Sequence, residues 1–368
     1  MTRIQQSINR RDWLGTALTM GGSLLLSPYL SKEFLRQNDA ETVIKLNANE
    51  NPYGPPKSVL DSIRHFDGEL FRYQGIYANN LREQLASFHG LESQMIMLGA
   101  GSSVLLQLLG HYVQQKSATL HYCSPTFNIL PDTLKKAGGK LNSLPLTTDY
   151  KFDLAALKEA DETPGAIYLV NPNNPTGTFY ERTEMELFCK SINSETLIIL
   201  DEAYIEYAGD GQSLVGLLKQ MPNLIIVRTF SKIYGMAGLR MGYLMASAAI
   251  IRQLQQLVPW PNHDLSTLSL VAAGNALQSS SFVQTTRTTN ARVMQSTIKA
   301  LESLGYRCSP SVANFVYFNT KGQNLRAALE GYGVQIGQLD YENQTYARVT
   351  VGKEQEMERF VQCLQKLN

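Results

Sequence analysis

The 368-residue sequence has few of the residues that build metal sites, disulfide frameworks or nucleic-acid surfaces. Its four cysteines lie far apart, at Cys123, Cys189, Cys308 and Cys363. Without a Cys-x-x-Cys pair they indicate neither a zinc site nor a set of disulfides, and five scattered histidines add no metal-ligand spacing. The formal net charge is only +1, so no broad positive field would attract nucleic acid. We therefore expect no metal and no nucleic-acid partner.

A long uninterrupted apolar run is also absent. The nearest candidate, residues 14–30, is uncharged but is broken by Gly21-Gly22 and Pro28, so we expect no stable membrane span. The paired arginines Arg10-Arg11 before this run resemble a bacterial twin-arginine export signal, which implies a periplasmic protein. No Ala-x-Ala cleavage site follows. The alternative is an N-terminal amphipathic helix that docks on the body of a cytoplasmic enzyme.

The sequence has the pattern of an α/β protein large enough for two domains. Apolar segments that predict buried strands recur at residues 95–98, 118–123, 166–170, 197–200, 224–227 and 242–246. Helices are expected between them, including one over residues 80–89 and one from Ser102 to about Gln115. Strands that alternate with helices predict a mostly parallel sheet with right-handed crossovers. Predicted helices at 266–278, 282–304 and 353–367, with strands at 315–318 and 346–351, then indicate a smaller domain.

The segment after residues 224–227 carries Thr229, Ser231, Lys232 and Arg240. A lysine just beyond a buried parallel strand lies where α/β proteins bind ligands. The hydroxyls and the guanidinium suit a phosphate, and the lysine supplies an amine nucleophile. Together they indicate a site for an aldehyde cofactor held as a Schiff base. The alternative is a surface lysine in an ordinary βα loop.

Polar residues also follow the ends of other predicted strands. Gly101, Ser102 and Ser103 open a helix, where free backbone N–H groups can bind a phosphate, although a plain helix cap is the alternative. The Gly-Lys-Ser/Thr ending of a P-loop is missing. Asp201 follows another strand, and a carboxylate in a closed pocket requires a cationic partner. Carboxyl ends of parallel strands share one edge of a sheet, so a single crevice can collect these groups.

Several motifs carry a resemblance to a known family. They are Thr229-Phe-Ser-Lys232, Ala237-Gly-Leu-Arg240, Asn171-Pro-Asn-Asn-Pro-Thr-Gly177, Asp201-Glu-Ala-Tyr204 and Ala347-Arg-Val-Thr-Val-Gly352. From about Leu46 onward the chain resembles fold-type I, pyridoxal-phosphate-dependent aminotransferases of class I/II, and among them the histidinol-phosphate aminotransferase group. The resemblance implies an α/β fold whose large domain has a mostly parallel seven-stranded sheet between helices, with a smaller α+β domain. We expect the large domain at 69–261, the small domain at 43–68 and 262–368, and a signal-like segment or arm at 1–42.

The resemblance also implies roles for individual residues. Lys232 would hold pyridoxal 5′-phosphate as a Schiff base and move the proton, Asp201 would pair with the pyridine nitrogen, and Asn174 and Tyr204 would contact the phenolic oxygen. Phe127 would stack on the ring, with an ordinary core phenylalanine as the alternative. The phosphate would be held by Gly101, Ser102, Ser103, Thr229, Ser231, Arg240 and Tyr73 of the partner subunit in a homodimer. Arg348 would bind the substrate anion, with a structural ion pair as the alternative, and Asn49 is a further substrate-contact candidate.

The sequence departs from the resembling group at Gly337, where histidinol-phosphate aminotransferases usually have a second phosphate-binding arginine. We therefore predict an aminotransferase that moves an amino group between an amino acid, or a histidinol-phosphate-like amine, and a 2-oxo acid. Histidinol phosphate is expected to be a poor substrate. A decarboxylase or C–S lyase on the same scaffold is one alternative, and a non-catalytic ligand-binding relative is another.

Overall fold

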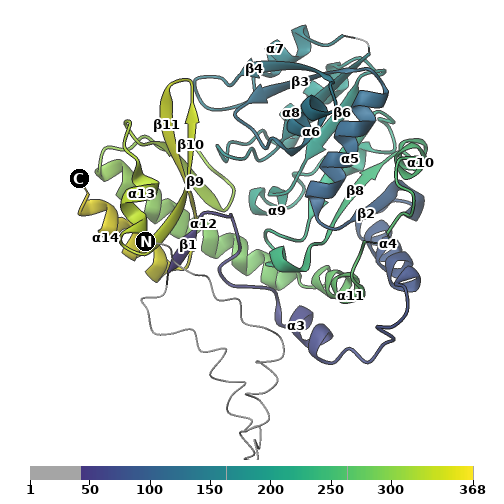
Figure 1. Ribbon diagram of the computed structural model, residues 1–368, viewed down its shortest axis with the longest axis horizontal. Coiled ribbons are helices and arrows are strands. Elements are labelled where there is room, and N and C mark those ends of the chain that lie inside the picture. Colours follow the sequence, from purple (N-terminus) through teal and green to yellow (C-terminus); the bar gives the residue numbers. More distant parts are fainter. Residues whose placement is uncertain (1–42, 163, 263, 368) are drawn as a thin grey trace, which may run out of the picture. The chain divides into compact units, whose positions relative to one another are not determined.

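The computed structural model describes residues 43–162, 164–262 and 264–367 (Figure 1). The twin-arginine pair Arg10-Arg11, the apolar run at 14–30 and the rest of the expected segment 1–42 lie outside the described residues. Within the described part, no helix is both long and apolar enough to cross a membrane.

The larger of two sheets has seven strands in the order β2-β8-β7-β6-β5-β3-β4. Their bounds are β2 Ile96–Gly99, β3 Thr119–Ser124, β4 Lys140–Pro145, β5 Gly165–Val170, β6 Leu197–Asp201, β7 Leu224–Thr229 and β8 Gly242–Ala246. Strand β8 runs antiparallel to both of its neighbours, β2 and β7, and the other pairs are parallel, so the sheet is mostly parallel, as the sequence predicts. Every residue of β5 and β7 is buried, which explains their continuous apolar runs.

Helices pack around this sheet, with the bounds α3 Lys57–Arg64, α4 Gly75–His89, α5 Ser102–Gln115, α6 Ile129–Lys136, α7 Leu154–Glu159, α8 Arg182–Ser191, α9 Ile205–Ala208, α10 Ala248–Gln256 and α11 Thr267–Ala276. Short 3₁₀ turns lie at Ser93–Met95, Val215–Leu217 and Ala237–Leu239. Helix α5 contacts β7 and β8. Its buried face includes Leu105, Leu109 and Val113, which follow the helical period. The N-terminus of α5 is thereby held at the carboxyl edge of the sheet.

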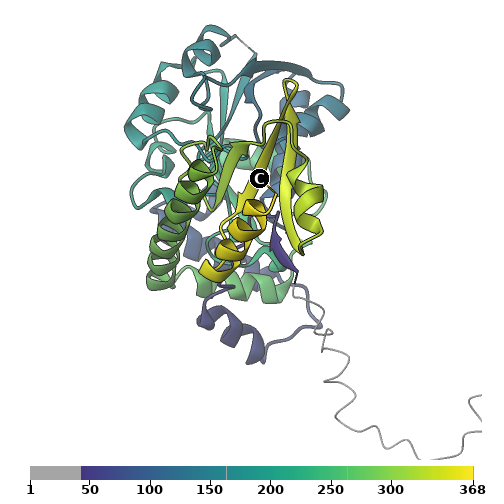
Figure 2. The same cartoon turned by 90° about the vertical axis from the view of Figure 1, so that its left-hand side faces the viewer.

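The smaller sheet has four strands in the order β1-β10-β11-β9, and it has a hydrophobic core of its own. The bounds are β1 Ile44–Leu46, β9 Phe315–Asn319, β10 Val334–Tyr341, β11 Gln344–Thr350, α12 Ser280–Ser303, α13 Leu325–Glu330 and α14 Glu354–Gln365. Figure 2 shows α12 and α14 side by side against this sheet, and α12 also contacts α9 of the larger part. Strand β1, from the start of the described chain, pairs in parallel with β10.

Two expectations about elements were wrong. Helix α4 begins at Gly75 rather than at residue 80, because its buried face already starts at Ala78 and continues through Leu81 and Leu85. Strands β4 and β10 were not predicted. β4 has no fully buried residue, and β10 mixes buried with half-exposed positions, so neither shows an apolar run.

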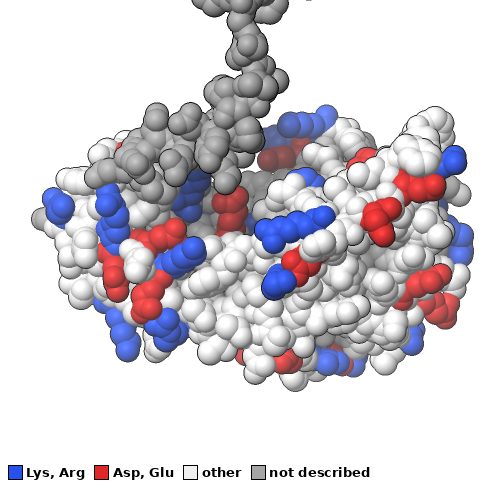
Figure 3. All heavy atoms as spheres, turned by 90° about the horizontal axis from the view of Figure 1, so that it is seen from below, with Lys and Arg blue, Asp and Glu red and all other residues white. Residues whose placement is uncertain are grey.

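Acidic and basic side chains are interspersed on the face shown in Figure 3. Salt bridges between exposed residues illustrate this mixing, for example Lys190 with Glu186 and Arg292 with Glu354. Such a surface produces no extended field of one sign.

Candidate functional site

A cavity of about 430 Å³ lies at the carboxyl ends of the parallel strands. Most of the residues singled out in the sequence line it, namely Asn49, Ser102, Ser103, Phe127, Asn174, Asp201, Tyr204, Thr229, Ser231, Lys232, Arg240 and Arg348. Sequence reasoning did not identify the remaining lining residues, Ala48, Glu50, Val170, Ala203, Ala237 and Gly238. The crossover connections of the sheet therefore collect groups from many segments in one place.

One wall of the cavity presents hydroxyls, the start of α5 and a guanidinium. Thr229 Oγ1 donates to Ser231 Oγ over 3.0 Å and accepts from the Ser231 N–H over 3.1 Å, so both hydroxyls are held in one turn. Arg240 has a left-handed backbone, with φ of 49°, and its Nη1 donates to the Ala237 carbonyl over 3.1 Å. These donors, with the free N–H groups of a 14-residue helix, suit an anion such as a phosphate.

Two glycines allow this wall to form. Gly101 has a φ of +86°, and a Cβ there would lie 2.3 Å from Arg240 Nη2. Gly242 on β8 lies so close to the start of α5 that a Cβ would be 2.5 Å from the Ser102 nitrogen. Gly101 itself is not among the lining residues, and its role is to let Arg240 approach the helix.

Lys232 lies in the loop that follows β7. Its Nζ donates to the backbone carbonyls of Ala48 and Asn49, each over 3.3 Å, and lies 5.5 Å from the centre of the Tyr204 ring. The segment after β1 therefore passes beside the amine. These contacts are long for hydrogen bonds, so the amine keeps the freedom to react with a carbonyl group.

Asp201 ends β6 and is 1% exposed. Its Oδ1 accepts the Ala203 N–H over 3.0 Å, and the Tyr168 hydroxyl lies 3.5 Å from Oδ2. Burial raises the pKa of this carboxyl to about 7, while the Ala203 N–H and the Lys232 ammonium act in the opposite direction. No cationic side chain among the described residues lies within ion-pair distance of it. A cation brought by a ligand would therefore favour the charged carboxylate.

Arg348, on β11, reaches the cavity from the smaller sheet. Its Nη1 donates to Asn174 Oδ1 over 2.7 Å, and its Nη2 donates to the Asn47 carbonyl over 2.7 Å. Its Nε is buried and has no acceptor within the described chain. Desolvation lowers the pKa of the guanidinium. Because Asn174 Oδ1 already accepts a hydrogen bond from Arg348, the amide nitrogen of Asn174 is the group left to donate to a ligand.

Asn49 is buried, and its side chain contacts other residues of the site. Its Nδ2 donates to the Tyr204 hydroxyl over 2.9 Å, and its backbone N–H donates to Thr350 Oγ1 over 2.9 Å. Thr350 was not identified from the sequence. The available signal was its position two residues after Arg348 in the same strand, which places both side chains on one face of the sheet.

Two further residues singled out in the sequence lie outside the cavity of this single chain. Tyr73 is 82% exposed just before α4 and is not among the residues that line the cavity. Gly337 on β10 pairs with Arg348 across the sheet, and a Cβ there would lie 3.6 Å from Arg348 Nη2. Position 337 is therefore the direct neighbour of the guanidinium.

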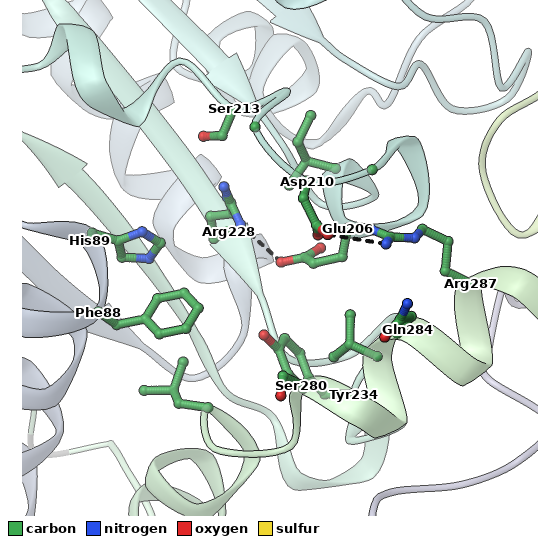
Figure 4. A pocket seen from close by; sticks show the side chains of 15 residues that line it. Phe88, His89, Glu206, Asp210, Ser213, Arg228, Tyr234, Ser280, Gln284 and Arg287 are labelled. Carbon is green, nitrogen blue, oxygen red and sulfur yellow. Dashed lines mark hydrogen bonds and ion pairs between the residues drawn. The ribbon is translucent and has the colours of Figure 1, made fainter.

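A second cavity, of about 320 Å³, lies beside α9 and the start of α12 (Figure 4). The charged groups labelled there form pairs, since Arg228 Nη1 lies 2.9 Å from Glu206 and Arg287 lies 2.8 Å from Asp210. His89 stays neutral because burial, aided by the nearby Arg228 charge, lowers its pKa to about 3. These groups already satisfy one another, which indicates a structural role.

The first cavity fits pyridoxal 5′-phosphate on three separate observations. The wall formed by Thr229, Ser231, Arg240 and the start of α5, called the anion wall below, suits the phosphate. The buried Asp201 carboxylate suits a protonated pyridine nitrogen, and the Lys232 amine suits an aldehyde. Asn174 and Tyr204 add polar side chains to the lining of the same cavity.

Comparisons with known proteins agree with this geometry. The model of the family "Aminotransferase class I and II" matches residues 41–364. A histidinol-phosphate aminotransferase of Nitrosococcus oceani is 34% identical over 95% of this chain and 96% of its own length. The histidinol-phosphate aminotransferase of Sinorhizobium meliloti, solved in complex with pyridoxal-5′-phosphate, is 25% identical, covers 95% of this chain and 100% of its own, and has a TM-score of 0.81.

A second solved structure shares the architecture. The L-threonine-O-3-phosphate decarboxylase of Porphyromonas gingivalis has a TM-score of 0.75 with 88% of this chain and 99% of its own covered. At 22% identity this likeness concerns the fold alone. The family model, by contrast, spans nearly all of the described residues, so the chain belongs to the aminotransferase class I and II family, and pyridoxal 5′-phosphate is its cofactor.

Proposed function

We propose that this aminotransferase exchanges an amino group between 2-oxo acids and amino acids that carry a single carboxylate and an uncharged or aromatic side chain. The observation that carries the proposal is Arg348. Among the cationic side chains that line the cavity, Arg348 comes from strand β11 of the smaller sheet, and its buried Nε has no acceptor in the described chain. One carboxylate would supply that acceptor.

Different residues of the cavity have different roles in the proposed reaction. When bound, pyridoxal 5′-phosphate supplies an aldehyde that reacts with amines and a ring that accepts electrons. Lys232 Nζ would hold this group through its aldehyde and, once free, would act as the base that takes the α-proton of the substrate and as the acid that returns it. Asp201 would keep the proton on the ring nitrogen of the bound group. Asn174 and Tyr204 would donate to its phenolic oxygen, and Phe127 would pack against its ring.

The substrate class follows from position 337. Curated relatives such as the Nitrosococcus oceani protein are named for histidinol phosphate, whose anionic group is a phosphate. In this chain Gly337 stands beside Arg348, where the resembling group usually has a second arginine. A charge-assisted bidentate contact contributes roughly 1.5–3 kcal/mol, so its absence weakens phosphate binding by about one to two orders of magnitude.

The test compares kcat/KM for histidinol phosphate, glutamate and a panel of amino acids with one carboxylate. We expect the last group to lead by tenfold or more, about 1.4 kcal/mol. Gly337→Arg should raise kcat/KM for histidinol phosphate, whereas Gly337→Gln, which adds similar bulk without charge, should not. The proposal is wrong if histidinol phosphate leads the panel of the unchanged enzyme. A protein with no turnover on any pair of substrates would support a non-catalytic relative, and CO₂ release would support a decarboxylase.

We further propose that the enzyme is a homodimer in which Tyr73 reaches the partner's cofactor phosphate. Large apolar side chains around it are exposed, including Leu70 at 61%, Phe71 at 77% and Ile76 at 67%. Trp260 is 72% exposed on a segment that the Gln74 side chain joins through the Asn262 carbonyl. A cluster of this kind on one surface favours association with a second copy.

We also propose export to the periplasm through Arg10-Arg11, with a cytoplasmic enzyme as the alternative. The support is the arginine pair followed by a modest apolar run. The test is fractionation of cells that produce the chain with both arginines replaced by lysine. Export through this signal predicts that the periplasmic activity disappears and the cytoplasmic activity rises. An unchanged distribution would contradict it.

A further inference from the structure

We infer that Asn49 and Thr350 are positioning residues that direct the hydroxyl hydrogen of Tyr204 toward the cofactor. The inference rests on pyridoxal-phosphate binding and not on the identity of the substrate. It follows from which groups in this network can donate a hydrogen bond and which can only accept one.

The first step fixes the orientation of the Asn49 amide. The backbone N–H of Asn49 can only donate, and it points to Thr350 Oγ1 over 2.9 Å. The Thr350 hydroxyl accepts there and carries one hydrogen of its own, which points to Asn49 Oδ1 over 3.4 Å. The side-chain oxygen of Asn49 therefore faces Thr350, and its Nδ2 faces the other way.

The second step concerns Tyr204. Asn49 Nδ2 lies 2.9 Å from the Tyr204 hydroxyl oxygen, and an amide nitrogen can only donate. Tyr204 must accept this bond, so its single hydrogen is left for another partner. The ring is 3% exposed and packs edge-on against Phe315, with centroids 5.2 Å apart at 81°. The hydroxyl therefore stays at the cavity wall, with its hydrogen free to bond the cofactor.

The third step concerns the segment that carries Asn49. Its backbone has a φ of 54°, a region that asparagine adopts more readily than most residues. Its carbonyl accepts from Asn314 Nδ2 over 3.1 Å and lies 3.3 Å from Lys232 Nζ. The same residue thus borders the reactive amine with its backbone and the tyrosine hydroxyl with its side chain.

The experiment measures the pH midpoint of the visible absorbance of the bound cofactor in the resting holoenzyme. A hydrogen bond donated to the phenolic oxygen favours the deprotonated form of the chromophore. Asn49→Gly removes the amide and tolerates the left-handed backbone, so it should raise the midpoint by about 0.5–1 pH unit. Thr350→Val should shift the midpoint in the same direction by less, and Thr350→Ser should restore the original midpoint.

A double-variant cycle separates this role from a merely structural one. If Asn49 acts through Tyr204, then Asn49→Gly added to Tyr204→Phe should cause no further shift. Asn51→Gly is the matched control, since the buried Asn51 amide donates to the Ile233 carbonyl over 2.7 Å and not to Tyr204. It should lower the melting temperature without moving the midpoint.

Two outcomes would overturn the inference. One is an unchanged midpoint in Thr350→Val and in Asn49→Gly with the cofactor saturating, and the other is an equal shift with Tyr204 present or replaced. A protein that shows no visible cofactor absorbance at all would instead refute the cofactor assignment.

Discussion

At the scale of single residues, Asp201 couples pH to stability. Its pKa is about 7 in the folded protein, against an ordinary value of 3.8, because burial disfavours the charge. Between these values the folded chain without cofactor binds a proton that the unfolded chain has released. Its free energy of unfolding therefore falls as pH rises from about 4 to 7, and the loss persists above pH 7.

Asp201→Asn should therefore affect stability and catalysis in opposite directions. At pH 8 we expect the cofactor-free variant to be more stable by about 1–3 kcal/mol, since no charge is buried at position 201, and its stability to fall less steeply from pH 4 to 7 than that of the unchanged chain. The holoenzyme should lose turnover by about 10²-fold or more, because the ring loses its anionic partner. Urea unfolding of the cofactor-free protein across this pH range and steady-state kinetics check the two effects. Normal turnover would show that Asp201 has only a structural role, as the acceptor of the Ala203 N–H.

Lys232→Ala should separate cofactor binding from reaction. We expect the variant to retain pyridoxal phosphate through the anion wall and Asp201, yet to lose transamination by at least about 10³-fold. Borohydride should attach the cofactor to Lys232 in the unchanged enzyme, as seen by peptide mass spectrometry. Lys219→Ala, at an exposed lysine, should behave like the unchanged enzyme. Borohydride labelling at another lysine would contradict the assignment.

At the scale of elements, the N-terminus of α5 is predicted to bind the phosphate because Gly101 admits Arg240. Gly101→Ala adds a Cβ that would lie 2.3 Å from Arg240 Nη2 at a φ of +86°. We expect the dissociation constant of pyridoxal phosphate to rise by about 10–100-fold, measured by titrating the cofactor-free protein. Gly90→Ala carries a similar backbone penalty at a φ of +65°, but nothing lies within 4 Å of the added Cβ. It should lower the melting temperature and leave the dissociation constant unchanged.

The elements also show what could be predicted from the sequence. Strands β5, β6 and β7 are apolar runs, and the polar residues that follow them line the cavity as expected, because parallel strands end at a shared edge. Strand β4 was missed because its alternation is weak and half-exposed. The contacts of Asn49 with Thr350 join residues 301 positions apart, and no local sequence pattern predicts a contact between residues so far apart. The pairing of β1 with β10 and the side-chain contacts of Arg348 and Asn314 bring these segments together.

At the scale of the whole molecule, the proposed homodimer predicts that inactive chains can complement each other. Lys232→Ala removes the amine from the site of its own chain, and Tyr73→Ala in the other chain removes the proposed phosphate contact from that same site. In a mixed dimer one site has Lys232 from one chain and Tyr73 from its partner, so its activity should recover to about half that of the unchanged dimer. Sedimentation and activity of the mixed sample check this. A fully active monomer, or mixing without recovery, would contradict the shared site.

The position of β1 limits how the chain can be shortened at its beginning. Ile44 donates its N–H to the Gly333 carbonyl, and within the next five residues Asn47, Ala48 and Asn49 supply carbonyls to Arg348 and Lys232. A shortened chain that starts at Val43 would keep every one of these contacts. A start at Asn51 would delete an edge strand together with the carbonyls beside the reactive lysine. Any shortening of the chain that preserves these contacts therefore has to keep Ile44 and the residues that follow it.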